Sequence, residues 1–343
     1  MPLTTVQAGM MDSTAQYYSF KNRIINGAMA IAQRATSAAL QFSSTNYTVL
    51  DRYVGFMAGA SQSGTFSRAA ITDLTGFNYC AKLQRTAAGT NTANIGMGQA
   101  IETLNCADLA GQIITFSFYA KAGANFSASG SNVFVQLASG TGTDQSFSNM
   151  TGSLWTGQVN LVNFTSQAIT TTWARYSFTV TLGATASQIG FQVGWTPVGT
   201  AGADDALYIT GVQIEKGSTA TSFDYRPYGT ELALCQRYYW RFDGGTGLQA
   251  VASGSIYGTT TTARVYLKFP TTMRSSPTLS FFGLVCSGGS NDNNVSAIAT
   301  QLSGIDSSLI DFTVAAGTIG QGKIVYVANG SYGTYYIQGT SEL

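Results

Sequence analysis

Short runs of alternating apolar and polar residues recur through most of this chain. In the run 111–123, Ile114, Phe116 and Phe118 share one face of an extended strand, because strand side chains point alternately to its two sides. The alternation returns over 176–182, 189–195, 208–214 and 265–269. Glycine, serine, threonine and asparagine fill the gaps between the runs, as they do in turns. The pattern predicts an all-β protein made of short strands.

The length and the break in this pattern predict two domains. A chain of 343 residues exceeds the roughly 250–300 residues that one hydrophobic core usually serves. The alternation stops near residue 228 and then restarts. We therefore expect a β-jelly-roll sandwich over 27–227 and a second, smaller C-terminal β-sandwich over 228–343. Residues 1–26 lack periodicity, so we expect an extended N-terminal segment there.

A junction helix is expected at 230–240. Thr230 is a favourable N-cap, and Glu231 would lie in the first turn, where the helix dipole favours an acid. Leu232, Cys235 and Tyr239 would share one helical face.

Charge and histidine content exclude several classes of function. Lys+Arg 17 against Asp+Glu 16 gives a net charge of +1, and charged residues make up only 10%. Such a chain has no field to attract nucleic acid or an anionic membrane. The absence of histidine removes the commonest general base and metal ligand. No P-loop, zinc spacing or nucleotide fingerprint is present, so we expect no catalytic residue, no metal and no cofactor.

The cysteines and the apolar stretches bear on location. Cys80, Cys106, Cys235 and Cys286 show no CxxC spacing, and we expect reduced, buried thiols. Cys80 and Cys106 could also face each other on paired strands, which spacing alone does not decide. The N-terminus shows no signal-peptide pattern, and no run of about 20 apolar residues exists, so we expect neither export nor membrane insertion.

Aromatic residues are the candidates for binding a sugar, which needs a ring face and polar groups around it. Trp155 stands among glycine and polar residues, which predicts a loop position that reaches solvent. Trp195 ends a strand at a turn and fits a core position and a binding position equally. Trp173 is expected to pack at a sandwich edge, and Trp240 to make an interdomain or intersubunit contact. The candidate glycan-binding residues are Trp155, Trp195, Tyr332, Tyr335 and Tyr336.

The last tyrosines lie in a glycine-, serine- and asparagine-rich segment, a composition typical of binding loops. Tyr335 and Tyr336 point to opposite faces if this segment is a strand, so one of them belongs to a core. Residues 287–296 predict an exposed loop, which either only connects two strands or contacts a receptor.

Acidic residues are few and scattered. Asp204 and Asp205 are adjacent in a glycine-rich turn, which fits a solvated turn or a calcium-type oxygen site better than a glycosidase pair. Glu102 and Glu215 lie within strand patterns. We expect each to anchor loop backbone through hydrogen bonds rather than to react.

The sequences of several segments are informative. KNRIINGAMAIAQRATS at 21–37, followed by YTVLDRYVGF at 47–56, resembles the opening of tail-fibre or appendage (receptor-binding) proteins of tailed bacteriophages and prophages. The segment 207–240, LYITGVQIEKGSTATSFDYRPYGTELALCQRYYW, is similar to the junction that those proteins place between a jelly roll and a terminal β domain.

Further segments extend the resemblance. The strands within 76–86, 99–123 and 170–180 follow the order found in jelly rolls of the carbohydrate-binding-module type. Residues 263–281 and the ending at 339–343 are similar to the C-terminal module of such phage proteins.

The resemblance implies a homotrimeric virion tail fibre or appendage, synthesised in the host cytoplasm. Its N-terminal segment would dock to tail or baseplate proteins, and its β domains would recognise a host surface polysaccharide without cleaving it. Residues 1–26 are too short for a long shaft, which favours a compact tip protein or a decoration. One alternative is a purely structural decoration or connector, and another is a depolymerase that uses Asp204 and Asp205.

Overall fold

A computed structural model describes residues 20–42, 45–243, 250–257, 260–287, 292–314, 324–329 and 335–343. The chain divides into two compact units, Met1–Glu231 together with Leu343 (unit 1) and Leu232–Glu342 (unit 2). The predicted boundary near residue 228 is the first residue of helix α2 (Tyr228–Gln236), and the division between the units falls within that helix, after Glu231.

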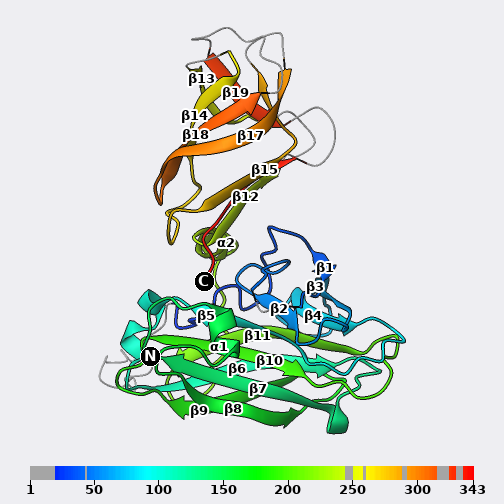
Figure 1. Ribbon diagram of the computed structural model, residues 1–343. Coiled ribbons are helices and arrows are strands. Elements are labelled where there is room, and N and C mark those ends of the chain that lie inside the picture. Colours follow the sequence, from blue (N-terminus) through cyan, green and yellow to red (C-terminus); the bar gives the residue numbers. More distant parts are fainter. Residues whose placement is uncertain are drawn as a thin grey trace, which may run out of the picture. The chain divides into compact units, whose positions relative to one another are not determined.

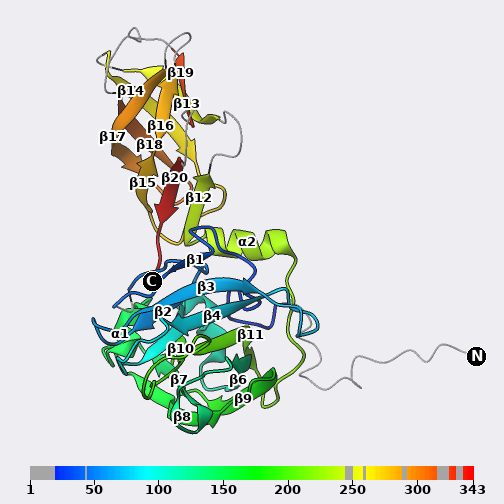
Figure 2. The same cartoon turned by 90° about the vertical axis from the view of Figure 1, so that its right-hand side faces the viewer.

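Unit 1 is a sandwich of two antiparallel sheets (Figures 1 and 2). The six-stranded sheet has the order β1 (Ser37–Ala39), β3 (Gly64–Ala70), β4 (Tyr79–Arg85), β11 (Ala206–Lys216), β6 (Ile113–Ala122) and β9 (Ala174–Thr181). The five-stranded sheet has the order β2 (Val54–Met57), β5 (Ile95–Ile101), β10 (Gln188–Trp195), β7 (Asn132–Gly140) and β8 (Val159–Ala168). Short helical turns at Thr103–Asn105, Ala107–Leu109 and Ser129–Ser131 and helix α1 (Phe147–Thr151) join the strands.

The core of unit 1 lies between these sheets. Ile114, Phe116 and Phe118 point inward from β6 as their alternation predicts, and all are fully buried. The ring of Phe116 lies 4.8 Å, centroid to centroid, from that of Phe191 on β10. The intervening β6 residues Thr115, Ser117, Tyr119 and Lys121 therefore belong to the outer face. The all-β prediction is confirmed.

The outer face of the five-stranded sheet is covered by side chains that lie directly on glycines. A Cβ at Gly98 would come within 2.4 Å of the Phe147 ring, and one at Gly190 within 2.6 Å of the Met150 sulfur. Phe147, Met150 and Trp155 form a buried cluster there. Ser146 begins α1 by accepting a hydrogen bond from the Asn149 amide at 3.2 Å. This short helix thereby covers part of the sheet.

The expected N-terminal segment 1–26 overlaps unit 1. Residues 1–19 lie outside the described residues. Asn22, Ile24 and Asn26 are buried in unit 1, at 2%, 0% and 0% exposure, so they belong to the sandwich. The end of the expected 1–26 segment is corrected accordingly, because Ile24 joins the hydrophobic core of unit 1 and the side chains of Asn22 and Asn26 are buried beside it.

Unit 2 contains a closed barrel and a small sheet. The barrel order is β13 (Ala250–Ile256), β14 (Thr262–Lys268), β18 (Ser307–Val314), β17 (Asp292–Ser303), β16 (Leu284–Ser287) and β19 (Ile324–Asn329). A three-stranded sheet has the order β12 (Tyr239–Asp243), β20 (Tyr336–Thr340) and β15 (Thr278–Phe282). The expected C-terminal sandwich is thus a barrel, because β19 pairs with both β13 and β16 and closes the sheet.

The junction helix is displaced toward the N-terminus. Helix α2 begins at Tyr228, so Thr230 is inside it rather than its cap, while Glu231 does lie in its first turn. Tyr239 and Trp240 belong to strand β12, which pairs with β20. Pairing with a strand about 100 residues away along the chain overrides the local helical pattern.

Trp240 lies in the core of unit 2, so the predicted interdomain or intersubunit role is wrong. Its side chain is 0% exposed and packs 5.5 Å, centroid to centroid, from Phe269. Gly339 on β20 leaves room for the indole, since a Cβ there would lie 2.8 Å from its Nε1.

The predicted exposed loop at 287–296 is mostly strand where it is described. Ser287 ends β16 and is buried, and residues 292–296 begin β17, whereas residues 288–291 lie outside the described residues. The two strands pair with each other at this point, which explains why the loop is shorter than predicted.

All four cysteines are buried and none forms a disulfide, as expected. Burial raises the pKa of Cys80 and of Cys106 to about 12, and that of Cys286 to about 11. These thiols are therefore protonated and act as small apolar side chains.

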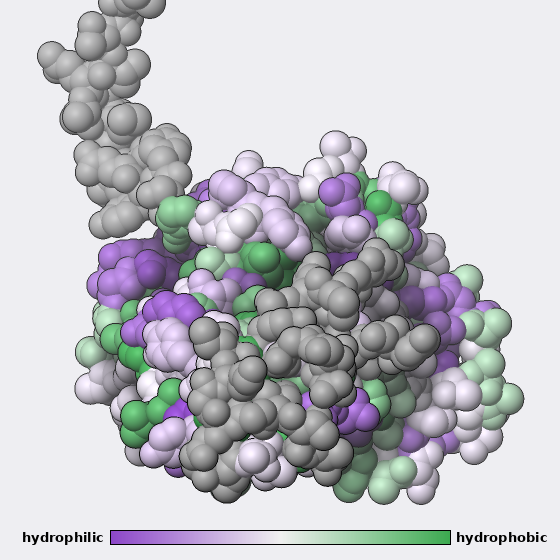
Figure 3. Space-filling view, turned by 90° about the horizontal axis from the view of Figure 1, so that it is seen from above, coloured by the Kyte–Doolittle hydropathy of each residue, from purple (hydrophilic) through white to green (hydrophobic). Residues whose placement is uncertain are grey.

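Exposed apolar residues are scattered over the described surface. The face drawn in Figure 3 shows hydrophilic and hydrophobic residues interspersed around the grey atoms. Isolated exposed side chains such as Leu104 and Leu154 are ordinary for a folded protein. Among the residues that the structure describes, no helix has the length and apolarity needed to cross a bilayer.

Asp205 is an internal anchor, not part of a solvated turn. Its carboxylate pairs with Arg85 at 2.8 Å, and both side chains are 0% exposed. Arg85 also donates to the carbonyls of Gly89 and Asn91 and to the Ser127 hydroxyl. The expectation of a solvated or calcium-type site at Asp205 is wrong, because a buried guanidinium already neutralises the carboxylate.

Replacing Asp205 is expected to destabilise unit 1 strongly. Asp205→Ala leaves the Arg85 charge buried and unpaired, at a cost of about 3–5 kcal/mol. Asp108→Ala removes an exposed partner of Arg23 and should cost no more than about 1 kcal/mol. Urea unfolding of both variants measures the difference, and equal stabilities would contradict the assigned role.

Candidate glycan-contact face

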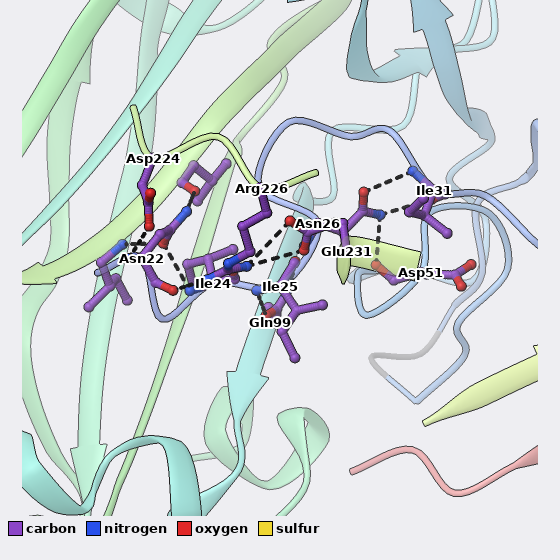
Figure 4. Close-up of polar contacts among 12 residues, drawn as sticks. Asn22, Ile24, Ile25, Asn26, Ile31, Asp51, Gln99, Asp224, Arg226 and Glu231 are labelled. Carbon is purple, nitrogen blue, oxygen red and sulfur yellow. Dashed lines mark hydrogen bonds and ion pairs between the residues drawn. The ribbon is translucent and has the colours of Figure 1, made fainter. Parts of the chain in front are cut away.

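The two most specific sequence motifs meet in a buried hydrogen-bond network (Figure 4). The Asn22 side-chain amide donates to the Val212 carbonyl at 3.0 Å, and its oxygen accepts from the backbone amides of Ile24 and Ile214. The Asn22 backbone amide donates to the Asp224 carboxylate at 3.0 Å. Residues from 21–37 are thereby fixed to residues of the 207–240 segment.

The same network continues through Asn26 and Arg226, as Figure 4 shows. The Asn26 side chain exchanges hydrogen bonds with the backbone of Ile31 and donates to the Asp51 carbonyl at 3.1 Å. Its backbone amide donates to the Glu231 carboxylate at 2.5 Å. Arg226 donates to the Ile24 carbonyl and forms an ion pair with Glu231 at 3.2 Å. Since these polar groups satisfy one another, the motifs are structural.

Glu215, within the second motif, has the anchoring role that its strand position predicted. It is 1% exposed, and its carboxylate accepts hydrogen bonds from the Thr221 amide at 2.9 Å and the Gln213 side chain at 2.6 Å. The prediction for Glu215 is confirmed. Glu102 is also buried, at 3% exposure.

The two candidate tryptophans of unit 1 are core residues. Trp155 is 4% exposed, and its indole donates to the Ser146 carbonyl at 2.9 Å. Its predicted solvent position is wrong, because α1 and the glycines beneath it enclose the ring. Trp195 is 0% exposed and packs 5.3 Å, centroid to centroid, from Phe126, which resolves its two alternatives in favour of the core.

The candidate tyrosines of unit 2 have three different outcomes. Tyr332 lies outside the described residues. Tyr335 is 8% exposed, while Tyr336 is half-buried on β20 and its ring is stacked with that of Phe282. Tyr336 is therefore the candidate from the sequence that presents a ring to a described surface.

A row of charged and aromatic side chains crosses the outer face of the six-stranded sheet. Lys82 on β4 is opposite Tyr208 on β11, and Tyr208 is opposite Lys121 on β6. Trp173 directly precedes β9, whose first residue pairs with Ala120 on β6. We call this set the Trp173 stripe. It consists of Lys82, Lys121, Trp173 and Tyr208 with the flanking acids Asp73 and Asp204.

Trp173 is held in place by two charged neighbours. Its indole donates to the Asp73 carboxylate at 2.9 Å, and the Lys121 ammonium lies 5.2 Å from its ring centroid. Lys121 in turn forms an ion pair with Asp73. The hydrogen bonds that Asp73 accepts from Lys121 and from Trp173 favour the charged carboxylate, so the pKa of Asp73 is below its ordinary value. The ring is thus fixed while it remains only half-buried.

Tyr208 is fixed at the centre of the stripe. Its hydroxyl donates to the Asp204 carboxylate at 2.8 Å, and the ammonium groups of Lys82 and Lys121 each lie 5.2 Å from its ring centroid. Burial and the Asp204 carboxylate raise the pKa of Tyr208 above its ordinary value, so it stays neutral. Gly123 allows this approach, since a Cβ there would lie 2.2 Å from the Asp204 carbonyl.

The stripe presents the chemistry that a pyranose ring requires. Aromatic rings can contact the apolar face of a pyranose, and ammonium and carboxylate groups can bind its hydroxyls. Within the described residues, no three His, Cys, Asp or Glu side chains gather in a way that could hold a metal ion. The arrangement therefore supports binding through rings and hydrogen bonds.

Sequence reasoning placed Trp173 at a sandwich edge and missed its partners. The strand alternation places Lys121 on the outer face, so this residue could have been found from the pattern. Tyr208 could not, because the alternation over 208–214 puts it on the face of the buried residues Val212 and Ile214, and the register shift between Thr210 and Gln213 reverses that assignment. Asp73 lies in the β3–β4 connection, 48 residues before Lys121, and no sequence spacing indicates that the two meet.

Neither a protein-family model nor a curated relative matches the chain. Its fold is similar to that of the enzymatically active domain of bacteriophage CBA120 tailspike protein 4, with 11% identity and a TM-score of 0.35 over 57% of this chain and 22% of that one. It is also similar to a CBM4 structure, with 16% identity and a TM-score of 0.31 over 56% of this chain and 98% of that one.

A xylan-binding domain from CBM 22 is similar at 14% identity and a TM-score of 0.29, over 52% of this chain and 94% of that one. This chain thus spans less than a quarter of the tailspike chain and nearly all of the two CBM chains. At such identities and scores these similarities concern fold alone and carry no argument about function.

Removing the Asn26 side chain is expected to destabilise unit 1. Asn26→Ala deletes buried hydrogen bonds to Ile31 and Asp51 and should cost about 2–4 kcal/mol. Asn132→Ala removes one exposed bond to Ser129 and should cost within about 0.5 kcal/mol. Chemical denaturation compares the two, and an Asn26 variant as stable as the Asn132 variant would show that the network is dispensable.

Proposed function

We propose that this protein is a non-enzymatic tail-fibre or appendage protein of a phage virion that recognises a host surface glycan through the Trp173 stripe. The observation that carries the proposal is the half-buried Trp173 ring, oriented by Asp73 and Lys121 on the outer face of the six-stranded sheet. A ring fixed before binding loses little conformational freedom when a sugar stacks on it. The phage assignment rests on the motif resemblance of the sequence.

The surroundings of the acids support a binding role rather than cleavage. Glycoside hydrolysis requires two carboxyl groups placed across a substrate. Asp205 is paired with buried Arg85, and Asp204 accepts hydrogen bonds from Tyr208 and from the Ala124 amide. The depolymerase alternative therefore has no support from this pair.

The second candidate is a structural decoration or connector of the virion, because the same open sheet face could equally contact another virion protein. Glycan binding and particle location separate the two candidates. Binding of the purified protein to bacterial surface polysaccharides supports recognition, whereas stable docking to capsid without any such binding supports decoration.

Trp173→Ala is expected to abolish most glycan binding. The variant loses the ring, and the apparent affinity for a bound polysaccharide should fall about 10-fold or more, which corresponds to about 1.4 kcal/mol. Tyr228→Ala, which removes a 65% exposed ring elsewhere in unit 1, is the matched control and should bind normally. An array of purified bacterial O-antigen and capsular polysaccharides measures both. Unchanged binding by the Trp173 variant would exclude the stripe as the contact surface.

The lowest pH at which the protein still binds glycan is expected to be set by protonation of Asp73. Since the Lys121 and Trp173 hydrogen bonds lower its folded-state pKa, the anchoring carboxylate is present above the ordinary value of 3.8 and is lost only as the pH falls through the lowered pKa. Affinity should be flat from neutral pH to about 4.5. Asp73→Asn should bind more weakly at neutral pH and show no transition attributable to this group. An affinity that falls between pH 7 and pH 5 would contradict this prediction.

The proposal includes assembly into a homotrimer, with the N-terminal segment attached to tail or baseplate proteins. The basis is the resemblance together with a nearly neutral chain, with a net charge of +1, which tolerates self-association. Sedimentation equilibrium of the full chain should give three times the monomer mass of 36.1 kDa. A monomer at micromolar concentration would contradict this part of the proposal.

A further inference from the structure

We propose that unit 2 carries a second sugar-binding surface, so that each chain recognises a repeating polysaccharide at two points rather than one terminal sugar. The inference rests on the proposed function of unit 1. The second surface lies on the outer face of the three-stranded sheet and consists of Arg241, Asp243, Phe282 and Tyr336. We call it the Phe282 platform.

The platform is a continuous stack of flat groups. Phe282 on β15 is opposite Tyr336 on β20, and their rings are stacked with centroids 6.2 Å apart and an interplanar angle of 27°. The Arg241 guanidinium lies over the Tyr336 ring, 4.1 Å from its centroid. Phe282 is 59% exposed, so this stack presents an aromatic ring to solvent.

The sheet behind the platform is anchored in the core of unit 2. Trp240, Phe281 and Ile337, on the same strands but facing the opposite way, pack in the barrel core cluster. On the outer face, Tyr239 donates to the Gln338 side chain at 2.6 Å, and Gln338 donates to Ser280 at 3.0 Å. These contacts fix the backbone and the neighbouring side chains, so the rings are presented by a rigid support.

The chemistry of the platform fits a sugar ring. An exposed aromatic ring contacts the apolar face of a pyranose, and the Arg241–Asp243 ion pair beside it offers both a donor and an acceptor for hydroxyl groups. The pair is neutral as a whole, which favours a hydroxylated ligand over a strongly charged one. The Trp173 stripe combines the same elements, with rings beside ammonium–carboxylate pairs.

Two such surfaces on one chain favour binding of a polymer over binding of a single oligosaccharide. A polysaccharide repeats its unit, and if two repeats of one polymer engage both surfaces of one molecule, the second contact is intramolecular. A single oligosaccharide gains nothing from this, because it can occupy only one surface at a time. The ligand class that gains most is therefore a long repeating polysaccharide of the cell surface.

The test uses the full chain and an array of purified bacterial O-antigen and capsular polysaccharides. A short oligosaccharide is released from the polysaccharide that binds and is titrated by calorimetry. The expected stoichiometry is two oligosaccharides per wild-type chain, one for Phe282→Ala, one for Trp173→Ala and none for the double variant. On the immobilised polymer, Phe282→Ala should lower apparent affinity by about 10- to 100-fold.

Two control variants separate the platform from general effects. Phe282→Tyr keeps the ring and should keep both sites. Tyr266→Ala removes a 56% exposed ring from the barrel strand β14 and should also leave the stoichiometry unchanged. Since Phe282 is exposed, its alanine variant should unfold at the wild-type temperature.

The outcomes distinguish the two proposals. If the wild type binds one oligosaccharide, Trp173→Ala abolishes binding and Phe282→Ala does not alter it, the platform is excluded and the proposed function stands. If Phe282→Ala abolishes binding and Trp173→Ala does not, the platform stands as a sugar site and the Trp173 stripe is excluded. If the wild type binds no polysaccharide on the array, glycan recognition and the second site are both overturned.

Discussion

The buried hydrogen bonds of Asn22, Asn26 and Arg226 are the constraint on which unit 1 depends. They join the first described segment to the segment that follows β11, so residues about 200 positions apart close the sandwich together. The amide and guanidinium groups satisfy backbone atoms that would otherwise be buried without partners, at a high free-energy cost. The two motifs with the most specific sequences therefore build the scaffold, and the Trp173 stripe on the outer face of the six-stranded sheet is left partly exposed.

Much of this architecture was predictable from local pattern, because strand alternation states which side chains point inward. Phe116 and Phe118 on β6 and the anchoring role of Glu215 follow from it. The burial of Trp155 does not follow from alternation, because it depends on glycines of β7 and β10, against which its ring packs. The barrel closure of unit 2 was equally hidden, since pairing of β19 with β13 and β16 leaves no mark on the alternation of any one strand.

The candidate sites show the same division between local and long-range information. Tyr336 was found from its composition, but its stacking on Phe282 depends on the pairing of β20 with β15. Trp173 was assigned to edge packing because Asp73, which fixes it, comes from a distant connection. In both places a ring alone is ambiguous. The charged neighbours that orient the ring make it a candidate contact surface.

Arg85 makes hydrogen bonds beyond its ion pair with Asp205. Its guanidinium contacts Ser127, Gly89, Asn91 and Gly199, which belong to three separate connections between strands. Lengthening any one of these connections would pull a carbonyl or hydroxyl away from a buried charge. Changes of length in these three connections at the rim of the sandwich are thus coupled through one side chain.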